Sequence, residues 1–155
     1  MLAGHYRASH KHRSRALLAA LSMASSLALA DAPLPLAQRL DAIEDVSRFT
    51  PLRALPQLAQ VEQESRAAPL AERAHYLALA CNTHDSLGHH ALASKLCDEL
   101  IELGRQHGDN TTIALGMLTK AYVLFSMNER LQSHELVWQA EKLATNSPTW
   151  PCGCG

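Results

Sequence analysis

Residues 74–103 read AHYLALACNTHDSLGHHALASKLCDELIEL, and residues 114–143 read ALGMLTKAYVLFSMNERLQSHELVWQAEKL. Offset by forty residues, the two segments match in their apolar positions and in their turn residues. The matched pairs are Ala74 with Ala114, Leu77 with Met117, Cys81 with Ala121, His84 with Leu124, Leu87-Gly88 with Met127-Asn128, Leu96 with Leu136, Leu100 with Ala140, and Leu103 with Leu143. Such a period of two helices is typical of stacked hairpins, because one hairpin cannot bury its apolar face alone.

Composition points to a single all-α domain. The chain has 155 residues, of which 47% are apolar and 19% are charged, so it can bury a core. Ala, Leu, Glu and Gln, which favour helices, are abundant. The seven glycines and seven prolines gather mostly at boundaries between helical segments. We therefore expect an all-α fold.

Helical spacing of apolar residues predicts three hairpins, over residues 36–66, 69–106 and 111–144, within a domain of residues 31–145. Thr50 is expected to cap a helix that has Pro51 at its first position. Pro56 predicts either a kink or a later start of that helix. Gly104, together with residues 108–110, is expected to close the fourth helix, and Asn110 or Thr111 to cap the fifth.

The first thirty residues have the organisation of a secretory signal peptide. Four basic residues precede an uncharged run over residues 16–29, and the run ends in Ala28-Leu29-Ala30. The run has about fourteen residues, whereas a membrane-spanning helix needs roughly twenty, so an uncleaved anchor is the less favoured alternative. We expect cleavage after Ala30 and export to a bacterial periplasm or out of the cell.

Removal of this segment changes the net charge of the chain. Residues 1–30 hold four of the 14 Lys and Arg residues and none of the 15 Asp and Glu residues, so the mature chain would carry a net charge of −5. An acidic protein lacks the electrostatic footprint of a nucleic-acid-binding protein. We therefore expect no nucleic-acid partner.

Residues 74–144 resemble tetratricopeptide repeats, in a form longer than the usual 34 residues. Small residues stand where the two helices of each hairpin would cross, at Cys81, Ala93, Ala121 and Ser133. The consensus Trp and Tyr of the family are absent, and of the turns only the first has its glycine, Gly88. The resemblance implies a right-handed superhelical stack whose concave surface binds a peptide, a protein or a small ligand. Candidate lining residues are Tyr76, Asn82, Thr83, Thr119, Tyr122 and Ser126.

A signal peptide followed by Ala- and Leu-rich hairpins is also similar to the periplasmic sensor region of membrane-bound GGDEF diguanylate cyclases. That family implies a following transmembrane helix and cyclase domain, and this chain contains no Gly-Gly-Asp/Glu-Glu-Phe motif. Residues 146–155 leave the helical pattern abruptly. We weigh equally an out-of-frame ending and a real, disordered tail. The function that we expect is the truncated sensor part of such a cyclase, and the alternative is a stand-alone periplasmic interaction or scaffold protein.

The cysteines allow two interpretations. Cys81 and Cys97 stand at similar heights on the two arms of one predicted hairpin, where a disulfide is feasible in an oxidising compartment. The alternative, which we favour from the sequence, is two buried free cysteines that fill small-residue positions. The Cys152-x-Cys154 pair lacks the second pair of a zinc site, so we expect no metal there.

No catalytic pattern is visible. The chain has no Gly-rich phosphate loop, no His-Glu-x-x-His and no Gly-x-Ser-x-Gly. His84, His89 and His90 gather around one turn, but they lack the spacing and carboxylate support of a metal site, and we expect solvated histidines. The sequence thus predicts a binding module without catalytic residues, cofactor or metal.

Overall fold

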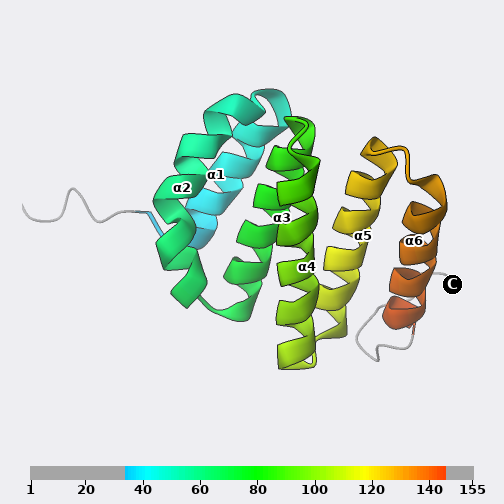
Figure 1. Ribbon diagram of the computed structural model, residues 1–155. Helices are drawn as coiled ribbons and strands as arrows, with labels where there is room; N and C mark the ends of the chain where they lie inside the picture. The colour runs from blue at the N-terminus through cyan, green and yellow to red at the C-terminus, as the bar shows by residue number, and fades with distance from the viewer. Residues whose placement is uncertain (1–33, 146–155) are drawn as a thin grey trace, which may run out of the picture. The chain divides into compact units, whose positions relative to one another are not determined.

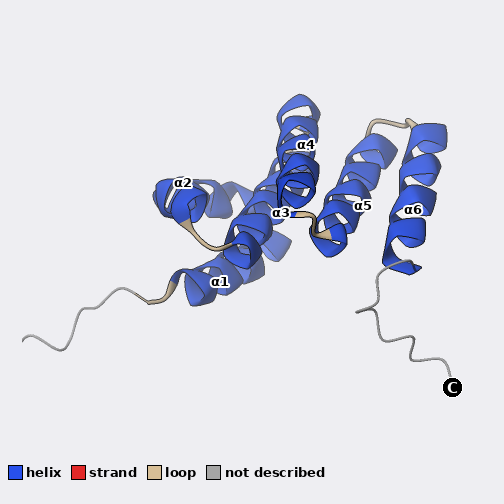
Figure 2. Ribbon diagram, turned by 90° about the horizontal axis from the view of Figure 1, so that it is seen from below, coloured by secondary structure: helices blue, strands red, loops and turns tan. Residues whose placement is uncertain are grey.

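The computed structural model describes residues 34–145 (Figure 1). The expected signal peptide, residues 1–30, and the expected irregular tail, residues 146–155, lie outside the described residues. All regular structure in the described part is helical (Figure 2). The helices are α1 (Leu36–Phe49), α2 (Pro51–Ala67), α3 (Leu70–Ser86), α4 (His90–His107), α5 (Asn110–Ser126) and α6 (Arg130–Thr145).

The six helices form an arrangement compatible with helical repeats. Each helix packs against the next one along the chain, and the first helices of successive pairs also touch, α1 with α3 and α3 with α5. Apolar side chains from consecutive helices fill the space between them, with Leu40, Leu100 and Leu103 fully buried. No helix among residues 34–145 combines the length and hydropathy needed to cross a bilayer.

The forty-residue offset is present in the backbone. Helices α3 and α4 begin at residues 70 and 90, and α5 and α6 begin at residues 110 and 130. The turns correspond as well, since Gly88 has φ 76° and Asn128 has φ 66°. In both turns the amide N–H that follows donates to a carbonyl five residues earlier, from His89 to His84 and from Glu129 to Leu124. These bonds close the two helices in the same way.

Thr50 is the N-cap residue of α2 and Pro51 its first residue, as predicted, but the Thr50 side chain makes no capping bond to α2. Its hydroxyl donates instead to the carbonyl of Val46 at the end of α1. The predicted cap of α5, Asn110 or Thr111, is wrong. The cap of α5 is Asp109, whose carboxylate accepts from the backbone N–H groups of Thr111 and Thr112. A carboxylate is the stronger acceptor and also favours the positive end of the helix dipole. Helix α2 begins at Pro51 and continues through Pro56, so the alternative of a later start is also wrong.

Gly104 does not close α4, contrary to the sequence-based expectation. It is buried inside the helix, where a Cβ atom would lie 2.7 Å from the backbone nitrogen of Ile113 on α5. Gly116 on α5 stands in the reciprocal position, and a Cβ there would lie 2.9 Å from the backbone nitrogen of Ile101 on α4. The two glycines therefore let α4 and α5 approach each other closely.

Replacement of either glycine by alanine is expected to destabilise the protein. Alanine raises helix propensity by about 1 kcal/mol, but the added methyl group meets backbone atoms that cannot move aside like a side chain. Overpacking of this kind costs about 1–3 kcal/mol. Chemical denaturation of Gly104→Ala and Gly116→Ala should thus show a lower free energy of unfolding. The exposed helical substitution Gln63→Ala should change it by less than about 0.5 kcal/mol. Equal or greater stability of both glycine variants would contradict the close approach.

Candidate functional site

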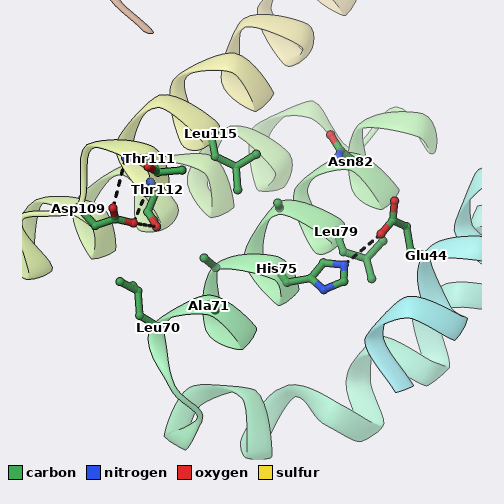
Figure 3. Close-up of a pocket in the computed structure, with 12 residues that line it drawn as sticks. Glu44, Leu70, Ala71, His75, Leu79, Asn82, Asp109, Thr111, Thr112 and Leu115 are labelled. Atoms are coloured by element: carbon green, nitrogen blue, oxygen red, sulfur yellow. Dashed lines mark hydrogen bonds and ion pairs between the residues drawn. The ribbon is translucent and has the colours of Figure 1, made fainter. Parts of the chain in front are cut away.

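A groove of about 610 Å³ runs between α1, α3 and the start of α5 (Figure 3). We call it the inner groove. It is lined almost entirely by the first helices of the three pairs, through Glu44, Leu70, Ala71, Ala74, His75, Ala78, Leu79, Asn82, Asp109, Thr111, Thr112 and Leu115. Its size falls within the range of ligand pockets, about 300–1,000 Å³.

Small side chains of α3 line the groove. Ala71, Ala74 and Ala78 follow one another at spacings of three and four along α3, so they lie on the same face of that helix. Ala74 and Ala78 are buried. Leu70, Leu79 and Leu115 add larger apolar surface around them. The lining is therefore mainly apolar and carries a few polar groups.

One end of the groove holds an ionic cluster between α1 and α3. Nε2 of His75 lies 3.1 Å from Oε2 of Glu44, and Nδ1 of His75 lies 3.9 Å from Oδ1 of Asp41. The Arg48 guanidinium donates to Glu44 at 2.7 Å. That hydrogen bond, helped by His75, lowers the pKa of Glu44, against the opposing effect of burial. Glu44 is therefore ionised at neutral pH.

The other end of the groove holds the cap of α5. Figure 3 shows the Asp109 side chain beside Thr111 and Thr112, across the groove from Glu44 and His75. The Thr112 hydroxyl and the backbone N–H groups of Thr112 and Thr111 donate to the Asp109 carboxylate. These bonds hold the pKa of Asp109 below its ordinary value of 3.8. A second carboxylate thus stays charged at neutral pH.

The acidic lining residues of the groove are Glu44, whose carboxylate already pairs with the guanidinium of Arg48, and Asp109. None of the lining residues is Lys or Arg. The lining also lacks a serine or cysteine beside His75 that would form a nucleophile and base pair. Among the described residues, no group of three His, Cys, Asp or Glu side chains is placed to hold a metal ion. The lining of the groove therefore combines apolar surface with two carboxylates.

The structure brings only one of the six predicted lining residues into this groove, namely Asn82. Thr83 and Thr119 are buried, and their hydroxyls donate to the carbonyls of Leu79 and Leu115, so neither is accessible to a ligand. Tyr122 is exposed away from the groove, and Ser126 donates to Asp85 in the turn after α3.

Tyr76 lies in a different depression, between α2, α3 and α4. It is almost completely buried there, and this burial, reinforced by the negative charge of Glu62, raises its pKa to about 12. The phenol is therefore neutral at physiological pH. Sequence reasoning missed Glu44, His75 and Asp109 as lining residues. The recurrence of small residues at positions 71, 74 and 78 was the available signal.

The histidines of the α3–α4 turn are partly paired. Nδ1 of His84 lies 3.2 Å from Nδ1 of His89, and burial, followed by the charge of His89, lowers the pKa of His84. Nδ1 of His90 lies 2.8 Å from Oδ1 of Asp85. Because Asp85 also accepts from Ser126, this cluster connects the turn to the end of α5.

Cys81 and Cys97 form a disulfide between α3 and α4, with their Cα atoms 6.0 Å apart. This distance lies in the usual range for disulfides. Both sulfur atoms are in the core, beside Ala93 and Val123. From the sequence we favoured two buried free cysteines at this position. The structure has a disulfide between them instead.

Comparison of the chain with protein-family models, with curated proteins and with solved structures finds no match.

The disulfide should make stability depend on reductant. Bridging residues sixteen apart stabilises a fold by about 3 kcal/mol in the chain-entropy description. We expect the melting temperature to fall when dithiothreitol is added. A Cys81→Ala/Cys97→Ala variant should melt at the same temperature with and without reductant. Non-reducing peptide mapping checks the linkage directly, and recovery of the two cysteines as free thiols from oxidised protein would contradict it.

The Asp109 cap should give a defined pH dependence. Because its pKa is lowered in the folded state, the carboxylate stabilises the fold above its unfolded pKa of 3.8, and this contribution is lost as pH falls through the lower folded pKa. Asp109→Ala should cost about 1 kcal/mol at pH 7, and the difference from the parent should shrink below pH 3.8. Asp109→Asn, which keeps a capping oxygen, should cost much less. Urea denaturation at pH 7 and at a pH below 3.8 measures the free energy of unfolding of each variant. A difference between Asp109→Ala and the parent that is the same at the two pH values would contradict the prediction.

Proposed function

We propose that the chain is a non-catalytic binding module that holds an apolar, basic peptide or protein segment in the inner groove. The observation that carries this proposal is the groove itself, which has a volume of about 610 Å³, is lined by three alanines of α3 and has an ionised carboxylate at each end. Stacked hairpins in other repeat proteins also present their binding surfaces over several repeats. We further propose that these hairpins are tetratricopeptide-like and stack in a right-handed superhelix.

Apolar contacts and ion pairs are expected to contribute unequally to the free energy of binding. Burial of one large apolar side chain of the ligand against the alanines contributes about 1.5–3 kcal/mol. A partly exposed ion pair with Glu44 or Asp109 contributes about 0.2–1 kcal/mol. Apolar contacts would therefore supply most of the affinity. The carboxylates would set orientation and would disfavour acidic segments.

For the biological role, we propose that the chain is the ligand-sensing region of a periplasmic signalling protein with the domain order of a membrane-bound GGDEF diguanylate cyclase. The support is the order of a signal-like segment and Ala- and Leu-rich hairpins. The alternative is a stand-alone periplasmic scaffold. DNA sequencing beyond the codon for Gly155, translated in every forward frame, separates them, because a transmembrane helix and cyclase motif would favour the sensor.

Peptide display against the folded protein tests the binding function. We expect enriched peptides to combine large apolar residues with Lys or Arg. Ala71→Trp should reduce their affinity at least tenfold, because Ala71 is an exposed lining residue and the indole would occupy space in the groove. Glu44→Gln should weaken binding of the basic peptides and reduce its dependence on salt.

The control variant is Ala42→Trp, which places the same side chain at an exposed position of α1 that does not line the groove. Its affinity should equal that of the parent. Calorimetric titration with each enriched peptide gives the comparison. Equal effects of the two tryptophan variants, or enrichment of acidic peptides, would reject the inner groove as the binding site.

A further inference from the structure

A second site is the depression that Tyr76 lines, between α2, α3 and α4. We call it the outer hollow. It has a volume of about 430 Å³ and shares no lining residue with the inner groove. Its lining combines three leucines and five charged side chains with the phenol of Tyr76. Charged groups are therefore more numerous here than in the inner groove.

The hydroxyl group of Tyr76 is available to a ligand. Tyr76 is only 9% exposed, and its hydroxyl forms no hydrogen bond with another of the described residues. Because no fully buried polar side-chain atom in residues 34–145 lacks a partner, this hydroxyl must open onto the hollow. Its pKa of about 12 keeps it protonated, so it can both donate and accept a hydrogen bond. Phenols that are buried to this extent usually have a hydrogen-bond partner.

Two carboxylates lie near the phenol. Burial, Glu62 and Glu99 raise the pKa of Tyr76, in that order of importance. Glu62 is already paired with Arg66, at 2.5 Å. Glu99 on α4 forms no ion pair with a described residue. Its carboxylate is therefore free to accept a hydrogen bond from a cationic group in the hollow.

Two cations complete the lining. Arg73 of α3 and Lys95 of α4 line the hollow, and neither forms an ion pair with a described residue. Asp98 and Glu102 lie beside them in an adjoining depression, but each of these acids is paired with a different basic residue. The two cations are therefore available to an anionic group.

We propose that the outer hollow binds a small zwitterionic molecule, namely an α-amino acid with an apolar side chain. Its carboxylate pairs with Arg73 and Lys95. Its ammonium group donates to Glu99 and to the phenolic oxygen of Tyr76. Its side chain lies on the leucines of the lining, of which Leu92 is 44% exposed.

A molecule with a single charge fits this lining less well. Lys95 and Glu99 stand four positions apart on α4, so both signs of charge share one face of the helix. A simple anion at Lys95 would lie beside the carboxylate, and a simple amine at Glu99 would lie beside the ammonium. A zwitterion satisfies both charges with one molecule, and the volume of the hollow lies within the range of ligand pockets.

Calorimetric titration of the full chain with L-leucine tests the proposal. We expect saturable one-to-one binding. The analogues 4-methylpentanoate, which lacks the ammonium group, and 3-methylbutylamine, which lacks the carboxylate, should bind at least tenfold more weakly. Tyr76→Phe, Glu99→Gln and Lys95→Gln should each weaken the binding of leucine at least fivefold.

The matched controls are Tyr122→Phe and Glu135→Gln, because both residues are exposed and line neither the outer hollow nor the inner groove. Both variants should bind leucine like the parent, and so should Ala71→Trp, which alters only the inner groove. Circular dichroism confirms that each variant is folded. Absence of saturable leucine binding, unchanged affinity in Tyr76→Phe and Glu99→Gln, or equal affinity for either singly charged analogue would overturn the proposal.

Discussion

The close contact between α4 and α5 is the constraint on which the rest of the molecule depends. Ile113 of α5 packs against Gly104 of α4, and Ile101 of α4 packs against Gly116 of α5. In each contact the absence of a glycine side chain leaves room for the isoleucine. These contacts fix the distance between the second helix pair, α3 and α4, and the last pair, α5 and α6. Because α5 also touches α3, that spacing places the start of α5 beside α3, and the inner groove lies between them and α1. The disulfide acts on the adjoining contact, where it joins α3 to α4.

The polar groups of the groove serve the fold and the site together. Asp109 caps α5 and also lines the groove, and Glu44 connects to His75 across two helices and lines it too. In each case hydrogen-bond donors lower the pKa of the carboxylate and keep it charged. A ligand that binds there meets charges already held in position, so little ordering of these side chains is needed on binding.

The sequence predicted the parts of the fold that are local or periodic. Helix positions followed from apolar spacing, and the equivalence of Gly88 and Asn128 followed from the forty-residue offset, since both have positive φ. Gly104 was misread because a glycine near a helix end usually terminates it, whereas its role here depends on a different helix. The pairing of Glu44 with His75 spans 31 residues, and no local pattern encodes it. Thr83 was predicted from its position to line the concave surface, but it is buried, and Ser47 and the carbonyl of Leu79 satisfy its hydroxyl.

Both ends of the described stack expose large apolar side chains. Terminal repeats of stacked proteins usually need a polar outer face, because no neighbour covers them. In the first pair, Phe49 and Leu52 are exposed although Gln38 and Asp45 of α1 are polar. In the last pair, Leu118 and Val137 are exposed, whereas their counterparts one repeat earlier, Ala78 and Cys97, are buried. The packing of each pair against its neighbour therefore buries apolar surface in the middle of the stack and leaves part of it in contact with water at both ends.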